Sequence, residues 1–230
     1  MTDVQDKTGS AQEQADEALQ RFADGFSWLR RSPVLHWPSE HGLDYEDITF
    51  PAHDGVPLEG WFIPAPASGK LIIANHPMGF SRSGMPTQYE PWHADWAASG
   101  NGFEVDLVPD YKILHDAGYN VLAYDLRNHG LSSAANGGVS THGITEWRDI
   151  AGSLAYARTR PKNVRVSTFL YQVRGDTLTH PSDVQAMYDN IPVTEKKLRW
   201  IEGTTARWDG YLEFQRRPQP MLDWFAQYMS

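Results

Sequence analysis

The chain has 230 residues and a formal net charge of −9, and it contains nine tryptophans and no cysteine. Clustered lysine and arginine, which nucleic-acid binding requires, are absent, so a nucleic-acid partner is excluded. The lack of cysteine excludes disulfide bonds, thiolate metal sites and a cysteine nucleophile. Because 40% of the residues are apolar, the chain can bury a substantial core.

The first 20 residues are polar and acidic, whereas a signal peptide begins with basic residues and continues with an apolar run. Apolar runs such as Leu71–Ala74 are too short to span a bilayer. No pair of histidines has the helical spacing of a metal motif. We therefore expect a soluble cytoplasmic protein with no membrane partner, no metal and no cofactor.

Residues 1–44 are expected to form a leader that is partly helical. Its apolar residues have helical spacing only at Ala18, Leu19, Phe22 and Phe26. A single domain is expected over residues 45–230, where short apolar runs alternate with helical patterns.

Strands and helices are expected to alternate along this domain. Apolar runs at 48–52 and 58–63 flank a His53-Asp54-Gly55 turn and predict an N-terminal β-hairpin. The apolar run Lys70–Asn75 is typical of a buried parallel strand. Further patterns predict helices over 109–117, 146–159, 181–190 and 220–229 and strands over 120–124, 166–173 and 197–201. The alternation predicts an α/β fold with a mostly parallel sheet flanked by helices.

Residues 80–108 form an unusually long connection between these elements. The segment carries aromatic residues among glycine, serine and proline. We expect a lid-like insertion in which the aromatic side chains cover an apolar ligand; the alternative is a small satellite core under a long loop.

Two motifs resemble the α/β-hydrolase superfamily. A buried strand leads into the loop Asp125-x-Arg127-x-His129-Gly130-x-Ser132, and an earlier strand leads into His76-Pro77-Met78-Gly79. The resemblance covers most of the chain after the leader and implies a hydrolase of carboxylic esters or related acyl compounds. It also implies an oxyanion site built from backbone N–H groups, for which Met78, Gly79 and Phe80 are candidates because proline has no N–H.

The sequence departs from the family pattern in two places. The family carries its nucleophile in a strand–turn–helix segment, but here helix 146–159 continues through Pro161 directly into a strand that begins near Val164. The family's histidine follows the last strand, and no histidine follows His180. Asp176 stands at the position of the family's acid. A serine without an imidazole is a poor nucleophile at neutral pH.

Other residues were considered as substitutes. Ser132 lies in a Gly-x-Ser-x-Ala sequence and is a weak nucleophile candidate, with His129 as a weak base candidate; the alternative for His129 is a structural hydrogen bond across its loop. His180 is a candidate partner for Asp176 or a surface residue. The expected pocket comprises His76, Trp92, Trp96, Asp125, Arg127, His180 and Trp208.

Loss of the nucleophile segment would leave unpaired strand edges. A right-handed crossover would let strand 166–173 move into the vacant place beside the earlier strands. If it did not, the exposed edges would join copies into a homo-oligomer. We therefore expect a hydrolase that is impaired or inactive, with a non-catalytic ligand-binding or oligomerising relic as the alternative. A small acyl or apolar molecule is the expected ligand.

Overall fold

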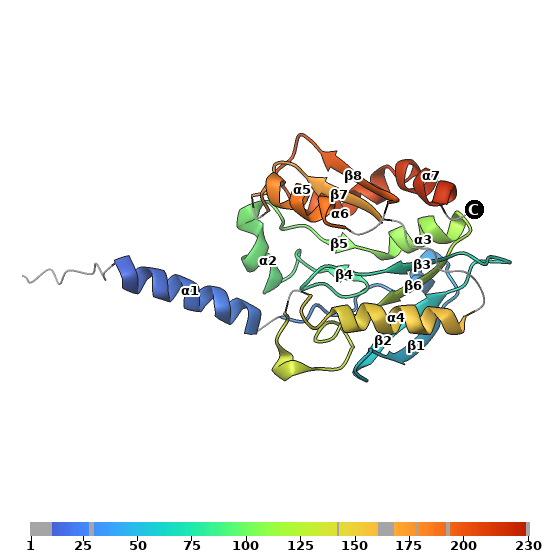
Figure 1. Ribbon diagram of the computed structural model, residues 1–230, viewed down its shortest axis with the longest axis horizontal. Helices are drawn as coiled ribbons and strands as arrows, with labels where there is room; N and C mark the ends of the chain where they lie inside the picture. Colours follow the sequence, from blue (N-terminus) through green and yellow to red (C-terminus); the bar gives the residue numbers. More distant parts are fainter. Residues whose placement is uncertain are drawn as a thin grey trace, which may run out of the picture.

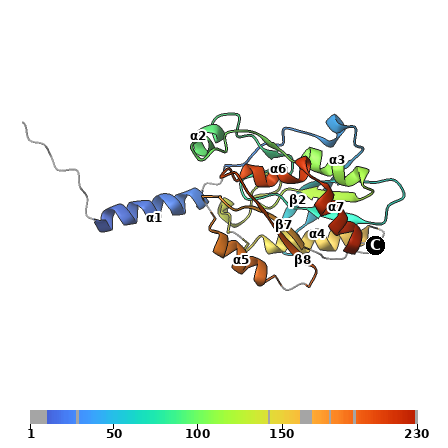
Figure 2. The ribbon, with the colours of Figure 1, turned by 90° about the horizontal axis from the view of Figure 1, so that it is seen from above.

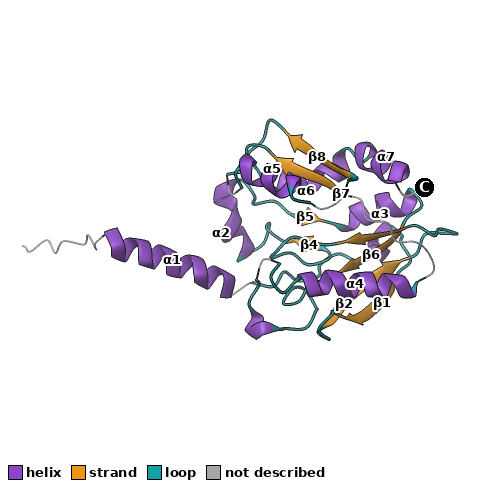
Figure 3. Cartoon of the chain, viewed as in Figure 1, coloured by secondary structure: helices purple, strands orange, loops and turns teal. Residues whose placement is uncertain are grey.

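The computed structural model describes residues 11–27, 30–141, 143–160, 168–177, 179–191 and 194–228. Its fold is built on two main sheets that do not pair with each other. The larger sheet has the strand order β1-β2-β6-β3 and is formed by β1 (Glu46–Pro51), β2 (Pro57–Ile63), β6 (Asn120–Tyr124) and β3 (Leu71–Ala74). The smaller sheet pairs β7 (Thr168–Val173) with β8 (Lys196–Ile201) in parallel. Figure 3 shows the two sheets as separate groups of arrows.

The predicted hairpin is present as β1 and β2, which pair antiparallel from Glu46 opposite Phe62 to Pro51 opposite Pro57. The turn between them contains Gly55 with a φ of 87°, a conformation that glycine adopts without steric cost. In β1, Ile48 and Phe50 are buried while their neighbours are exposed, which is the alternation of a strand with one face on the core.

Strand β6 is buried along its whole length and lies between two helical layers. Helix α3 (Val108–Asp116) packs on one face of the larger sheet, and helix α4 (Trp147–Thr159) packs on the other. The predicted helices and the predicted strand 120–124 are therefore confirmed as elements at these places. Both faces are covered, as the α/β pattern requires.

The C-terminal part consists of the β7–β8 sheet with helices α5 (Pro181–Asp189), α6 (Trp208–Arg216) and α7 (Gln219–Tyr228). Helix α6 was not predicted. It places Trp208 and Phe214 in the same core as α3, so it fixes the smaller sheet against the larger one. Figure 1 shows this C-terminal part beside α3 and away from β1 and β2.

The α/β fold with flanking helices is confirmed, but two details of the sheet differ from the expectation. The larger sheet is mixed, because β1, β2 and β6 are antiparallel neighbours and only β3 and β6 are parallel. Strand β7 does not fill the vacant place, since among the described residues it pairs only with β8. A cavity that α3, α6 and α7 also line lies between β3 and β7. The predicted junction from Pro161 to Val164 lies outside the described residues.

The segment 80–108 contains the short strands β4 (Gly84–Met85) and β5 (Val105–Asp106), helix α2 (Trp92–Trp96) and a 3-10 turn at Ala97–Ser99. Its ends are buried in the main core at Phe80, Met85, Val105 and Val108. A lid is therefore not confirmed, because much of this segment is part of the core.

Part of the expected leader also packs on the domain. Helix α1 (Ala11–Ser27) extends away from the rest of the molecule in both views (Figures 1 and 2). Farther along, Val34 and Leu43 are buried in the same core as α3, with a 3-10 turn at Pro38–His41 between them. None of the helices described is both long and apolar enough to cross a membrane.

The centre of the larger sheet provides a test of this packing. Leu122 in β6 has no exposed surface, so Leu122→Ala should lower the free energy of unfolding by about 2–5 kcal/mol, through lost burial and a residual cavity. Urea denaturation measures the loss. Leu131, which is 60% exposed, is the matched control, and Leu131→Ala should change the same quantity by less than about 0.5 kcal/mol. Equal losses for the two variants would contradict this packing.

Candidate functional site

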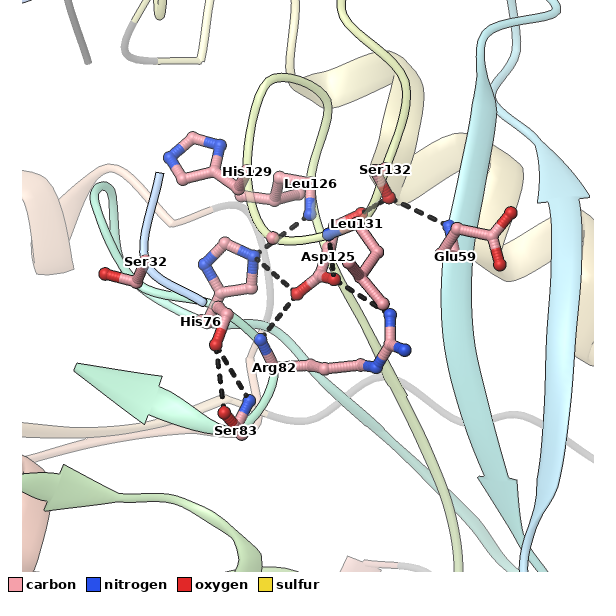
Figure 4. A network of polar contacts seen from close by, with 12 residues as sticks. Ser32, Glu59, His76, Arg82, Ser83, Asp125, Leu126, His129, Leu131 and Ser132 are labelled. Atoms are coloured by element: carbon pink, nitrogen blue, oxygen red, sulfur yellow. Dashed lines mark hydrogen bonds and ion pairs between the residues drawn. The ribbon is translucent and has the colours of Figure 1, made fainter. Parts of the chain in front are cut away.

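The buried Asp125 carboxylate organises the loop at the end of β6. Its Oδ1 accepts a hydrogen bond from the Arg82 backbone N–H at 2.6 Å, and its Oδ2 accepts from Arg82 Nη1 at 2.8 Å and from the Leu131 N–H at 2.8 Å. The side chain has no exposed surface. Because a buried carboxyl group without hydrogen-bond partners is costly, these donors stabilise Asp125 in its buried position (Figure 4).

His76, at the end of β3, is committed to the same loop. Its Nε2 accepts the Leu126 N–H at 3.0 Å, and its Nδ1 lies 2.8 Å from the Pro77 carbonyl oxygen. This pattern corresponds to a neutral ring with the proton on Nδ1. Burial, and then the neighbouring His129, lower the pKa of His76 from 6.5 to about 4. The ring is therefore neutral at pH 7, and both nitrogens are occupied.

Ser132 also has a structural environment. Its hydroxyl donates to the Asp125 carbonyl at 2.6 Å and accepts the Glu59 N–H at 2.8 Å, so it joins the loop to β2. The residue is 1% exposed. Both contacts are with backbone groups, so neither provides a base that could take up the hydroxyl proton.

His129 is equally buried and does not contact the Ser132 hydroxyl through any hydrogen bond of the described residues. Its Nδ1 lies 2.8 Å from the Arg127 carbonyl oxygen, and its ring centre lies 5.0 Å from that of His76. Burial lowers the pKa of His129 below its ordinary value. Its Nε2 is buried without a partner in the described part of the chain. The interaction that holds this ring is thus the structural one across the loop.

Arg127 and Gly130 complete the motif for structural reasons. Arg127 Nε and backbone N–H donate to Asp149 at 2.8 Å each, and its other nitrogens donate to Asp54 at 2.8 and 3.0 Å. These bonds tie the loop to α4 and to the β1–β2 turn. Gly130 has a φ of 43°, and a Cβ there would lie 2.2 Å from the Asp125 carboxyl carbon. Only glycine fits this position.

Asp176, at the acid-like position after β7, is paired with an arginine. Its Oδ2 accepts from Arg207 Nε at 2.8 Å and from Gln172 Nε2 at 3.2 Å. Arg207 lies in the loop after β8 and also donates to the Thr179 hydroxyl. A guanidinium thus contacts the carboxylate from the loop in which the resemblance would place a histidine. Arginine does not give up its proton in proteins, so it cannot serve as a base.

His180 lies nearby in sequence but caps a helix. Its Nδ1 accepts the Ser182 N–H at 3.3 Å at the start of α5 and is 2.8 Å from the Ser182 hydroxyl. These contacts match the surface alternative rather than a partnership with Asp176.

The turn after β3 keeps two of the three expected oxyanion donors. The Phe80 N–H donates to the Pro77 carbonyl at 3.2 Å and is occupied. For the N–H groups of Met78 and Gly79, no hydrogen-bond acceptor is found among the described residues. Gly79 has a φ of 85°, and its carbonyl accepts from the Ser32 hydroxyl. Glycine adopts this left-handed conformation without steric strain.

The tryptophans of the expected pocket form a packed aromatic cluster. Trp208 lies 4.8 Å from Trp96 and 5.4 Å from Phe80 between ring centres, and its Nε1 donates to the Thr87 hydroxyl at 3.1 Å. Trp92 packs against the same core. The satellite-core alternative therefore describes these side chains better than a ligand cover.

A cavity of about 440 Å³ lies elsewhere, between β3 and β7. No residue of the expected pocket lines it. Its walls come from the two strands, from the turn after β3 and from three helices: Ile72, Ile73, Ala74, Asn75, Pro77, Leu107, Asp110, Tyr111, Leu114, Phe169, Leu170, Tyr171, Gly210, Tyr211, Phe214, Met221 and Phe225. The sequence signal that could have located it is the run of consecutive apolar residues in both strands, which marks central strands of a sheet.

No group of three or more histidine, aspartate or glutamate side chains suited to a metal ion occurs within the part of the chain that the structure describes. The three candidate catalytic residues Ser132, His129 and Asp176 share no hydrogen bond in the described part of the chain. The catalytic assignments of these three residues remain predictions.

Comparison with known proteins supports the fold. No protein-family model and no curated protein matches the sequence. Among solved structures, the esterase Pf2001 of Pyrococcus furiosus is similar with a TM-score of 0.62 and 18% identity, over 87% of this chain and 99% of the esterase chain. A second crystal form of the same esterase gives 0.59 and 18% identity, over 87% and 97% of the two chains.

A third similar structure is ATU1826 of Agrobacterium tumefaciens, a protein of unknown function considered a candidate α/β hydrolase. Its TM-score is 0.50 at 14% identity, over 77% of this chain and 95% of that chain. Together with the mixed sheet and its flanking helices, these likenesses show that the chain has the α/β-hydrolase fold.

The buried His76 makes stability depend on pH. The unfolded chain binds a proton at this residue below pH 6.5, whereas the folded chain does so only near pH 4, so stability should fall as the pH decreases through this window. The loss attributable to His76 is about 3 kcal/mol. His76→Gln, which retains a donor and an acceptor, should show a shallower decrease in urea denaturation between pH 6.5 and 4. Parallel profiles for the two proteins would refute this assignment.

Proposed function

We propose that this chain is a ligand-binding protein on the α/β-hydrolase fold, which holds an apolar or acyl ligand and does not hydrolyse it by a serine–histidine–acid mechanism. The observation that carries the proposal is the ion pair between Arg207 and Asp176 at 2.8 Å. In a working triad the carboxylate orients a histidine and stabilises its protonated form. Here the same carboxylate is neutralised by a side chain that cannot accept a proton.

The surroundings of Ser132 support the same conclusion. To act as a nucleophile, its hydroxyl would have to leave the Asp125 carbonyl and the Glu59 N–H, which it contacts at 2.6 and 2.8 Å. Each such bond contributes about 1 kcal/mol to stability, and its loss would leave buried backbone groups without partners. A serine also needs an adjacent base, and neither contact of this hydroxyl supplies one.

The cavity between β3 and β7 is the proposed binding site. Its volume of about 440 Å³ lies within the range of about 300–1,000 Å³ that is usual for small-ligand sites. Most of its lining is aliphatic or aromatic, which suits an apolar ligand. Burial raises the pKa of Asp110 well above its ordinary value, so this lining carboxyl is neutral over a wider pH range and can donate a hydrogen bond to a ligand oxygen.

A second candidate function is the hydrolysis of carboxylic esters. The N–H groups of Met78 and Gly79, without acceptors among the described residues, favour it because they follow Pro77, which lines the cavity. Such a pair could stabilise an oxyanion. The similarity to the fold of an esterase agrees with this candidate. It requires a nucleophile and base other than the residues discussed above.

Activity measurements separate the two candidates. We expect the purified protein to give no hydrolysis of p-nitrophenyl butyrate above the buffer rate and no labelling by a fluorophosphonate probe, because Ser132 has no base. Ser132→Ala, checked for folding by circular dichroism, should give the same result. Labelling that disappears in Ser132→Ala would overturn the proposal, and labelling that persists would favour hydrolysis through another nucleophile.

A further inference from the structure

The cavity exposes strand edges, not only strand faces. Ile72, Ile73 and Ala74 of β3 are consecutive and all line it, as are Phe169, Leu170 and Tyr171 of β7. Neighbouring residues in a strand point to opposite faces of a sheet, so three in a row border one space only if that space adjoins the edge of the strand. The cavity is therefore bounded on two sides by polypeptide backbone.

Both edges lack a pairing partner. In the part of the chain that the structure describes, β3 pairs only with β6 and β7 pairs only with β8. Apart from those two ladders, no backbone hydrogen bond of residues 72–74 or 169–171 is found among the described residues. Each edge thus presents N–H and C=O groups toward the cavity. These residues are half-buried, and the more their backbone groups are withdrawn from water, the more costly it is to leave them without hydrogen bonds.

We propose that this cavity is a strand-binding slot, in which an extended peptide segment of another polypeptide inserts between β3 and β7 and pairs with both. This inference rests on the proposed function and names the ligand class of the same site. An inserted strand would satisfy the backbone groups of both edges and join the two sheets into one. An alkyl chain of the same volume would leave those groups without hydrogen bonds.

The dimensions and lining of the slot define the peptide. A strand residue rises about 3.3 Å, lies about 4.8 Å from the next strand and fills a layer about 10 Å thick, so it occupies about 160 Å³. The cavity of about 440 Å³ therefore holds about three residues. The helical side chains of the lining come from α3, α6 and α7, and none comes from α4. One face of the peptide therefore meets an apolar wall, and alternate residues of the peptide should be apolar.

Charge favours basic residues beside this apolar core. The chain has a formal net charge of −9, so a cationic peptide is attracted to it at long range. Both edges border the same cavity, so one inserted strand pairs with both of them. This arrangement argues against the homo-oligomer, joined through exposed strand edges, that the sequence suggested.

The test uses a fluorescein-labelled peptide with the sequence Lys-Val-Thr-Val-Thr-Val-Lys and two N-methylated forms of it. Each form carries N-methyl groups at alternate residues, which removes the donors toward one edge while all side chains remain. By fluorescence anisotropy, the parent peptide should bind, and each methylated form should bind at least about tenfold more weakly, because it loses buried hydrogen bonds.

Protein variants locate the site. Leu170→Trp should fill the slot and weaken peptide binding, whereas Met187→Trp, at an exposed position of α5 that does not line the slot, should not. Thermal unfolding of both variants verifies that they are folded. A second readout that does not depend on these variants is competition between the peptide and dodecanoate.

The outcomes distinguish this inference from the function on which it rests. Equal binding of the parent and both methylated peptides would overturn strand pairing. Binding of dodecanoate alone, sensitive to Leu170→Trp, would overturn the peptide and retain the cavity as an apolar ligand site. If neither the peptide nor dodecanoate binds, the cavity is not the binding site and both proposals fail.

Discussion

Backbone hydrogen bonding at two facing strand edges is the constraint on which the organisation of this molecule depends. Strands β3 and β7 each pair on one side only among the described residues, and the space between them is lined by consecutive residues of both. Backbone hydrogen bonds between strands therefore cannot join the two sheets. The two parts are joined instead by apolar packing, in which Trp208 and Phe214 of α6 enter the core that α3 forms on the larger sheet. The cavity is what remains where this packing does not reach the strand edges.

The polar network around Asp125 gives a structural reason for the most family-like motif of the chain. Asp125 is held by Arg82 and by backbone N–H groups, and Arg127 is held by Asp149 and Asp54. Arg82, Asp125, Arg127 and Asp149 are buried, whereas Asp54 is partly exposed. Removal of any one of the buried charges would leave its buried partner uncompensated. The motif can therefore persist for its structural role. The fold similarity to esterases concerns this scaffold, and a scaffold does not by itself determine an activity.

The same place in the molecule bears on both candidate functions. The resemblance places the nucleophile on a strand in the middle of the sheet, and the cavity lies between two strands that have no partner there. The side chain that would complete the acid's role is an arginine, whose charge stabilises Asp176 without accepting a proton. The proposed binding function thus needs neither of these family elements and uses the space between β3 and β7.

The sequence alone determined the local elements and the fold class, because both depend on periodicity and on short motifs. The strand 120–124 and the helix 146–159 were predicted within about one residue of β6 and α4, and the glycine of the Asp125 loop is explained by its left-handed conformation. Helix α6 was missed, although Trp208, Tyr211 and Phe214 recur at helical spacing, because the preceding residues were interpreted as one loop.

Only the tertiary structure decided which strands pair, where the cavity lies and which side chain faces Asp176. These features depend on contacts between residues far apart in the chain, such as Asp176 with Arg207 and β3 with α6, and no local pattern encodes them. The crossover rule allowed β7 to enter the vacant place, but β7 pairs with β8 instead, and a cavity separates it from β3. Whether the strands join into one sheet or the aromatic side chains pack beside them depends on the free energy of the whole fold.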